Sequence, residues 1–451
     1  MTEKEVYTVA VDLGTTTLVL YLLREGLKGY TVCQAVSEEN PQQEFGKDVI
    51  SRISYIGEDK KKLETFQRLI ADTCSFLIRQ MCERQDCHSG QIRQIVFAGN
   101  PTMCHILLGY LPLSLAEAPF SHQYQGSWKG KGSRLHISGF EAAEIYVLPG
   151  IGQHVGADTV AAMVATISQN SGRQLLVDIG TNGEIVIEKD GEYFACSAAA
   201  GPALEGGEIS QGMVAKQGAI TEVTFDKEQN RYCLNWIGKE TGEKPFGICG
   251  SGLVDAVAAL CEMGVLEESG RLLPANVAKE KGVPYSLTKR LVEIEGQQAF
   301  VLYIEREVML AQAVGTPDLF VRYVKEQGNS VILLTQQDIR AVQLAKGALF
   351  AAMKVLLKVA GLQIPQVERV YVAGAFGNYI RPESAVRIGL FPEEWIGKLL
   401  PCGNAAGEGC CKVAMEPEMK KWAEKIPERV RHIPLANSKV FQEYYLDAMH
   451  F

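Results

Sequence analysis

The chain has 451 residues, of which 47% are hydrophobic and 22% charged, and its formal net charge at pH 7 is −8. This length exceeds what one hydrophobic core usually serves, so we expect at least two domains. The acidic balance argues against a nucleic-acid-binding protein, which would carry a basic stripe, and no apolar run approaches the ~20 residues of a membrane span. Twelve scattered cysteines in a large chain are typical of reduced thiols, so we expect a cytoplasmic protein.

The first predicted element is a β-hairpin over about 6–24. Its first apolar run ends at Asp12, turns through Gly14-Thr15-Thr16-Thr17 and resumes at Leu18. Glycine lets a backbone approach an anion, threonine hydroxyls add donors, and a carboxylate at the strand end can reach a hydrated Mg²⁺. The turn is a candidate phosphate loop, although a single D-x-G-T turn is a weak signal because polar hairpin tips are common.

The rest of the first half alternates strands with helices. The polar segment 40–53 is interpreted as a surface loop and short helix, and residues 112–143 as a polar insertion. Apolar runs and helical spacing predict strands at 29–36, 94–100 and 144–149, and helices at 60–83, 102–108 and 156–165.

The second half repeats this order, beginning with the same hairpin at 174–188. Asp178 again ends a strand, and Gly180-Thr181-Asn182-Gly183 forms the second candidate phosphate loop. A strand at 192–197 follows. A long helix is predicted from Thr335, whose spacing to Asp338 makes a capping box, to Gly361. After it come a strand ending in Gly374-Ala375-Phe376-Gly377-Asn378, a strand at 431–435 and a helix at 437–451.

Further segments occur in one copy only. They are a Gly-rich loop at 199–207, a Gly-rich turn at 247–252 that leads into a helix, and an insertion at 264–330 with its own hairpin. The duplication predicts an α/β protein with two copies of one fold. We expect residues 1–168 to form the first domain and residues 169–451 the second.

At this point the sequence resembles the superfamily of actin, sugar kinases and heat-shock chaperones. This resemblance implies a duplicated ribonuclease-H-like (actin-like ATPase) α/β fold, with two mixed-sheet domains around a nucleotide cleft. Within this superfamily, the chain is similar to the reductive activators of corrinoid proteins, and the matching motifs cover nearly its whole length. They are VDLGTTT, NPQQEFGKDVISRI, AGNPTMCHILLG, LVDIGTNGEI, AAAGPALEGGEISQGM, GICGSGLVD, QLAKGA and VAGAFGNYI.

The resemblance implies an ATPase that helps to pass one electron to an oxidised cobalamin, returning Co(II) to Co(I) in a corrinoid protein or methyltransferase. It places Asp12 and Asp178 at Mg²⁺, and the two loops Gly14 to Thr17 and Gly180 to Gly183 at the phosphates of ATP. Residues Gly374 to Asn378, with Lys346, would lie on the adenosine side. No covalent nucleophile is needed, because a carboxylate-oriented water can attack the γ-phosphoryl group.

The chain departs from the family pattern at its start. Typical activators carry an N-terminal ferredoxin-like domain with a two-iron, two-sulfur cluster, whereas this sequence begins almost directly at its first strand. No iron–sulfur cluster is therefore expected in this chain, and a separate ferredoxin-like donor would supply the electron. A homodimer is the family-based expectation.

Three other functions stay open. A small-molecule kinase would need a general base, for which Asp158 and Glu205 are candidates. A 2-hydroxyacyl-CoA dehydratase-type activator shares a cluster across a dimer, which draws attention to Cys402, Cys410 and Cys411, although buried thiols are the simpler interpretation. The third is a module that binds ATP and a partner without a redox role. We interpret Cys82, Cys87 and His88 as structural, and His105 and His154 as locally hydrogen-bonded.

Overall fold

The computed structural model describes residues 5–26, 29–117, 120–124, 126–152, 154–169, 171–305, 331–374 and 379–451. These residues group into two compact units, both discontinuous in sequence. The first comprises Met1–Asp178, Val186–Ser197 and Asn404–Pro434, and the second comprises Ile179–Ile185, Ala198–Gly403 and Leu435–Phe451. The chain therefore returns to its first unit near the C-terminus. A single boundary near residue 168 stays a prediction.

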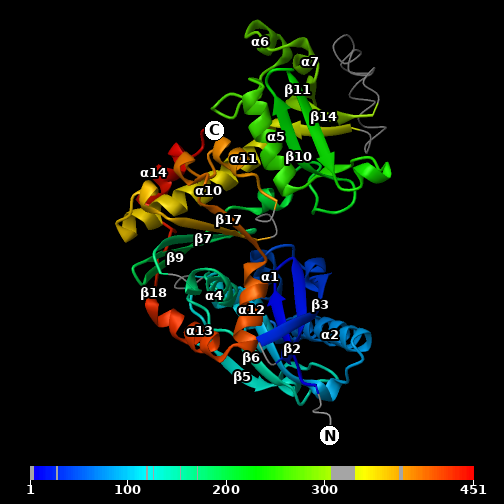
Figure 1. Cartoon of the computed structure of the whole chain (residues 1–451), viewed down its shortest axis with the longest axis vertical. Coiled ribbons are helices and arrows are strands. Elements are labelled where there is room, and N and C mark those ends of the chain that lie inside the picture. The colour runs from blue at the N-terminus through cyan, green and yellow to red at the C-terminus, as the bar shows by residue number, and fades with distance from the viewer. Residues whose placement is uncertain are drawn as a thin grey trace. The chain divides into compact units, whose positions relative to one another are not determined.

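The first unit is built on a six-stranded sheet of order β3-β2-β1-β4-β6-β5 (Figure 1). Strand β1 is central, so nearly all of its residues are buried, which explains its continuous apolar sequence. It pairs antiparallel with β2 and parallel with β4. The strands are β1 (Tyr7–Leu13), β2 (Thr17–Gly26), β3 (Gly29–Glu39), β4 (Ile92–Gly99), β5 (Trp128–Lys131) and β6 (Glu144–Val147).

Helices cover this sheet, and the predicted helices of the first half are confirmed. Helix α12, from the C-terminal part of the chain, packs on β1 and β4 and against α4, while α2 packs on β2 and β3 (Figure 1). The helices of this unit are α1 (Val49–Ile56), α2 (Lys60–Arg84), α3 (Pro101–Leu108), α4 (Ala157–Ala165), α12 (Ala405–Met415) and α13 (Pro417–Arg429), with short 3-10 helices η1 (Pro41–Glu44), η2 (Ser89–Gln91), η3 (Pro112–Leu115), η4 (Gly132–Leu135) and η5 (Ile167–Gln169).

Residues 112–143 are more than the predicted polar insertion. They contribute the edge strand β5, which pairs antiparallel with β6, and they bury Leu135, Ile137 and Phe140. The polar composition concealed these few apolar side chains, whose burial is decided by long-range pairing.

The second predicted hairpin is confirmed as β7 (Arg173–Ile179) and β8 (Gly183–Lys189), followed by β9 (Glu192–Ala198). These strands lie in the second six-stranded sheet, of order β17-β16-β7-β8-β9-β18, with β16 (Arg369–Ala373), β17 (Leu399–Gly403) and β18 (Val430–His432). The edge strand β18 pairs parallel with β9.

The second unit carries the long helix α10 (Gln336–Ala360). Thr335 is its N-cap in a capping box with Asp338, and Gly361 is its left-handed C-cap, both as predicted. Helix α14 packs along α10, and α11 packs against α5 (Figure 1). The other helices are α5 (Gly250–Glu262), α6 (Ala275–Glu280), α7 (Tyr285–Thr288), α11 (Pro382–Arg387) and α14 (Lys439–Asp447), with η6 (Pro202–Glu205), η7 (Lys239–Thr241), η9 (Ile364–Gln366) and η10 (Glu393–Trp395).

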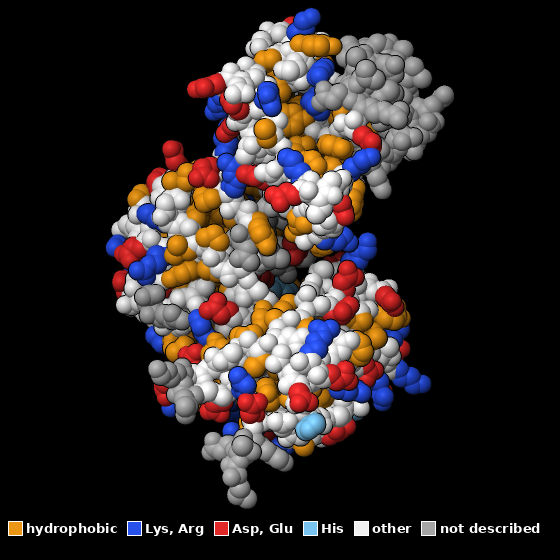
Figure 2. Space-filling model, turned by 45° about the vertical axis from the view of Figure 1, so that its right-hand side comes forward, with side chains coloured by type: hydrophobic (Ala, Val, Ile, Leu, Met, Phe, Trp, Pro, Cys, Tyr) orange, Lys and Arg blue, Asp and Glu red, His pale blue; other side chains and the backbone are white. Residues whose placement is uncertain are grey.

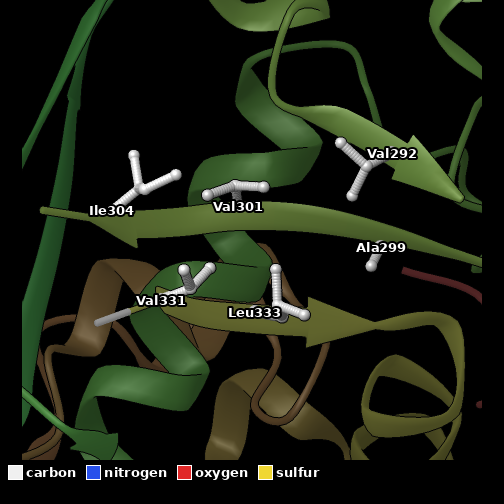
Figure 3. Close-up of a cluster of buried hydrophobic side chains, with 6 residues drawn as sticks. All are labelled: Val292, Ala299, Val301, Ile304, Val331 and Leu333. Atoms are coloured by element: carbon white, nitrogen blue, oxygen red, sulfur yellow. The ribbon is translucent and has the colours of Figure 1, made fainter. Parts of the chain in front are cut away.

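Two three-stranded sheets complete this unit. The sequence did not reveal the sheet β11-β10-β12, formed by β10 (Ala219–Asp226), β11 (Arg231–Trp236) and β12 (Gly247–Ile248). The other has the order β13-β14-β15, with β13 (Leu291–Ile294), β14 (Gln297–Ile304) and β15 (Val331–Thr335), and contains the predicted hairpin. Its buried cluster of aliphatic side chains is shown in Figure 3: Val292, Ala299, Val301, Ile304, Val331 and Leu333.

Basic and acidic side chains are interspersed on the face of the molecule seen in Figure 2. Within the described ranges, every helix is too short or too polar to cross a membrane.

Candidate functional site

The first candidate phosphate loop joins β1 to β2 through a tight turn. The backbone N–H of Gly14 donates a hydrogen bond to the Thr17 carbonyl at 3.1 Å. A Cβ atom on Gly14 would lie only 2.4 Å from that same carbonyl oxygen. Glycine is therefore required for this turn to close, because any side chain would push the two strands apart.

Asp12 lies one residue before the end of β1 and is half-buried. Asn404 donates a hydrogen bond from Nδ2 to the Oδ2 atom of Asp12 at 2.8 Å. Burial raises the pKa of Asp12 to about 7, against the lowering effect of the Asn404 bond, and the nearby Asp158 carboxylate raises it further. A carboxylate so placed gains strongly from a neighbouring cation, which would favour its ionised form.

Asn404 was missed by the sequence interpretation. It is the N-cap of α12, where its Oδ1 atom accepts from the backbone N–H of Gly407 at 2.7 Å. The same side chain also donates to the hydroxyl of Tyr21 at 3.3 Å. An asparagine directly before a helical Ala-Ala-Gly segment is an N-cap signal, but its contact with Asp12 depends on a sequence separation of 392 residues.

Asn100 contributes to the loop in the same way. It is the N-cap of α3, with Oδ1 accepting from the N–H of Met103 at 3.0 Å, and it donates from Nδ2 to the Thr15 hydroxyl at 2.8 Å. Two helix caps therefore fix two polar side chains of the first hairpin, those of Asp12 and Thr15.

The second candidate loop has a different turn. Here the N–H of Gly180 donates to the carbonyl of Asn182 at 3.0 Å, and β8 begins at Gly183. The Thr181 hydroxyl donates to Oε2 of Glu205 at 2.8 Å, and burial raises the pKa of this glutamate. Glu205 was considered as a kinase base, and the structure places it beside the loop threonine.

Asp178 lies at the position in β7 that matches Asp12 in β1. It is half-buried and next to last in its strand. The two aspartates thus occupy equivalent places in the two hairpins, as the duplication predicts. Their assignment to Mg²⁺ stays a prediction.

The adenosine-side residues are described only in part. Gly374 follows β16 with a positive φ of 96°, and its N–H donates to the Gly403 carbonyl at 2.9 Å. The predicted binding residues Ala375, Phe376, Gly377 and Asn378 lie outside the described residues.

Lys346, predicted on the adenosine side, is buried on α10. Its Nζ donates to the His450 carbonyl and lies 5.1 Å from the centre of the Phe451 ring. Burial lowers the pKa of this lysine to about 8. It is one wall of a cavity of about 580 Å³ formed with α11 and the end of α14. Lys346 thus contacts the C-terminal residues of the chain, and its role on the adenosine side of ATP stays a prediction.

Most of the other candidate side chains have structural partners. Cys410 lies against the backbone carbonyls of Val11 and Val96, and Cys402 against that of Leu400. His105 is buried, with Nδ1 at 2.7 Å from the Pro101 carbonyl and Nε2 accepting from the N–H of Gln123 at 3.1 Å.

Cys82 and Cys87 share a hydrogen bond at the end of α2. Across the described parts of the chain, no three His, Cys, Asp or Glu side chains form a group that could hold a metal ion.

The first loop fits a phosphate group on the evidence of its own backbone. The N–H groups of Thr15 and Thr16 have no acceptor among the described residues, and Gly14 beside them carries no side chain. Asp12 beside them fits a Mg²⁺ ion, which binds through one or two carboxylates and otherwise keeps its waters. Bound Mg²⁺ would supply charge neutralisation at the phosphates.

Comparison with known families decides the assignment. The family model described as the RACo middle region matches residues 7–170, and the model described as the C-terminal domain of RACo, the ASKHA domain, matches residues 173–308 and 286–451. The chain belongs to the RACo family. This confirms both the resemblance to reductive activators of corrinoid proteins and the actin-like, sugar-kinase-like α/β fold.

Individual relatives agree with this assignment. The RACo-family chain is 32% identical over 444 residues to "Corrinoid activation enzyme RamQ" of Eubacterium limosum, covering 98% of this chain and 70% of that protein. It is 24% identical over 474 residues to the "[Co(II) methylated amine-specific corrinoid protein] reductase" of Methanosarcina barkeri, covering 98% and 76%. The solved "Reductive activator for corrinoid,iron-sulfur protein" has a TM-score of 0.82 at 29% identity, over 100% of this chain and 67% of that one.

Proposed function

We propose that this RACo-family enzyme performs ATP-dependent reductive activation of a corrinoid protein or corrinoid methyltransferase. Binding and hydrolysis of Mg-ATP would accompany the transfer of one electron to Co(II), giving Co(I). The electron would come from a separate ferredoxin-like donor. A cytoplasmic location and a homodimer belong to the same proposal.

The observation that carries the proposal is the first loop. Two backbone N–H groups that have no acceptor in the described part of the chain lie in a turn that only glycine permits, next to a half-buried carboxylate. Such a group of donors favours phosphate oxygens, and the carboxylate favours the accompanying Mg²⁺. The family membership supplies the corrinoid partner.

The test measures ATP hydrolysis and the cobalamin spectrum together. A corrinoid protein is held under a low-potential reductant with and without Mg-ATP. Co(I) should appear only with ATP, and both signals should be lost in Asp12→Asn and Asp178→Asn. Asp72→Asn, on the exposed face of α2, is the matched control and should behave as the wild type. Nucleotide turnover without any effect on corrinoid would contradict the redox part of the proposal.

A small-molecule kinase is the second candidate, favoured by one observation. Asp158 is a half-buried carboxylate close enough to Asp12 to raise the pKa of Asp12. Oδ1 of Asp158 accepts a hydrogen bond from the backbone N–H of Thr159 at 2.7 Å, which fixes its orientation. ATP turnover that rises with a small hydroxyl-bearing substrate, and not with a corrinoid protein, would support this function instead.

A further inference from the structure

The sequence predicts a surface loop and short helix for segment 40–52, but in the structure this segment donates hydrogen bonds to the backbone carbonyls of the first candidate phosphate loop. Asn40 donates from Nδ2 to the Gly14 carbonyl at 2.8 Å and from its backbone N–H to the Thr16 carbonyl at 2.8 Å. Gln43 donates from Nε2 to the same Thr16 carbonyl at 2.7 Å. Arg52 donates from its guanidinium to the Thr15 carbonyl at 2.6 Å. Three successive carbonyls of the loop are thus held by one segment.

These bonds determine where the loop N–H groups point. In a trans peptide the C=O and the following N–H point in opposite directions. Holding the Gly14 carbonyl therefore turns the Thr15 N–H away from segment 40–52, and holding the Thr15 carbonyl does the same for the Thr16 N–H. These are the two N–H groups that lack an acceptor among the described residues.

The burial of the charged Arg52 side chain costs free energy. Its side chain is fully buried, and its other hydrogen bonds go to neutral groups: the Gly46 carbonyl at 2.9 Å, Oε1 of Gln42 at 3.1 Å and the sulfur of Met103 at 3.3 Å. Burial lowers the pKa of Arg52 to about 10, against the raising effect of the carboxylate of Asp48, the N-cap of α1. A buried charge without a bonded counter-ion is destabilising by itself. A phosphate on the far side of the loop would offset part of that cost.

We propose that Arg52 is a positioning residue which, with Asn40 and Gln43, fixes the first loop in its phosphate-binding conformation and adds positive potential behind it. This inference rests on the proposed function, because it takes the loop ligand to be the phosphate chain of ATP. Arg52 acts through the Thr15 carbonyl and does not itself touch the nucleotide.

We call Asn40, Gln43 and Arg52 the brace, because their hydrogen bonds hold the carbonyls of the first loop. Two variants test the brace, and they differ in the risk that the protein fails to fold. Gln43→Ala removes one hydrogen bond from a partly exposed side chain, so the protein should fold normally. Arg52→Lys keeps a charge but not the guanidinium geometry. Arg79→Lys is the matched control, since Arg79 also donates to backbone carbonyls, those of Ser75 and Ser138, away from the loop. Calorimetry would measure the affinities for Mg-ATP, inorganic tripolyphosphate and adenosine, beside the melting temperature of each variant.

We expect the brace variants to lose affinity only for the ligands that carry phosphate. Gln43→Ala and Arg52→Lys should weaken Mg-ATP and tripolyphosphate by about tenfold or more, as the loss of a hydrogen bond to an orienting carbonyl implies, and leave adenosine unchanged. Arg79→Lys should bind all three as the wild type does. Wild-type affinity for Mg-ATP in both brace variants, with only a lower melting temperature, would show a purely structural role and overturn the inference.

The same data separate this inference from the proposed function. If the wild type binds tripolyphosphate but not ATP, and both brace variants lose tripolyphosphate, the brace stands while the ATP function falls. If the wild type binds neither compound, both are overturned.

Discussion

Substituting alanine for the first glycine of each loop should affect the two hairpins unequally, although their sequences match. On Gly14 the new Cβ would lie 2.4 Å from the Thr17 carbonyl oxygen, about 1 Å inside an ordinary contact of 3.4 Å. On Gly180 the nearest atoms would be the Asn182 carbonyl oxygen at 3.5 Å and Oε1 of Glu205 at 4.0 Å, which is ordinary contact. The structure therefore predicts strain in the first loop only.

The magnitude follows from two effects in the first loop. Forcing an extra methyl group into a packed site costs about 1–3 kcal/mol, and the hydrogen bond from Gly14 to Thr17 would contribute about 1 kcal/mol more when it is lost. Gly14→Ala should thus lower the free energy of unfolding by about 2–4 kcal/mol. In a unit of this size that corresponds to roughly 4–16 °C in melting temperature. Gly180→Ala should stay within about 1 kcal/mol of the wild type.

Differential scanning calorimetry of both variants, with Mg-ATP affinity measured beside it, is the assay. A melting temperature of Gly14→Ala within about 1 °C of the wild type would refute the reasoning, since the strain converts to several degrees. So would equal destabilisation by the two substitutions.

Three further predictions concern packing, pH and metal. Gly409→Ala in α12 should destabilise the first unit by about 3 kcal/mol or more in chemical denaturation, because the new Cβ would lie 1.7 Å from the Ala161 carbonyl oxygen of α4. Gly397→Ala is the control and should leave the stability unchanged, because no neighbouring atom lies within 4 Å of the new Cβ. Burial raises the pKa of Asp255 to about 6, so the protonated form is favoured in the folded state and the wild type loses stability as pH rises from about 4 through 6. The free energy of unfolding of Asp255→Asn should therefore exceed that of the wild type by about 1–3 kcal/mol at pH 8, and the difference should vanish near pH 4. Removing Mg²⁺ with EDTA should weaken ATP binding at least tenfold or so in calorimetry, and the loss should be absent in Asp12→Asn.

Sequence reasoning was most successful where local patterns decide the structure. The two hairpins, α2 and α10 follow from apolar periodicity, and the ends of α10 follow from a capping box and a C-cap glycine. The duplication also located both candidate loops correctly at the strand ends. These features depend on residues within a few positions of one another.

The supports of the loops could not be predicted in this way. Asn404, Asn100 and Arg52 reach the first hairpin from distant segments, and each has an unremarkable local role as a helix cap or a helix residue. The hydrogen bond between Thr181 and Glu205 likewise joins residues that are 24 positions apart, so no local pattern predicts it.

The sequence by itself therefore determined the family, the fold class and the position of both glycine turns, because these are written in short motifs and in their repetition. Only the tertiary structure decided that the turns differ. The first closes so tightly that a Cβ on Gly14 would strike the Thr17 carbonyl, and segment 40–52 donates hydrogen bonds to three of its four carbonyls. The second leaves room at Gly180. The physical reason is that hydrogen-bond partners and contact distances arise between residues far apart in sequence, and near-identical local motifs acquire different surroundings when the chain folds.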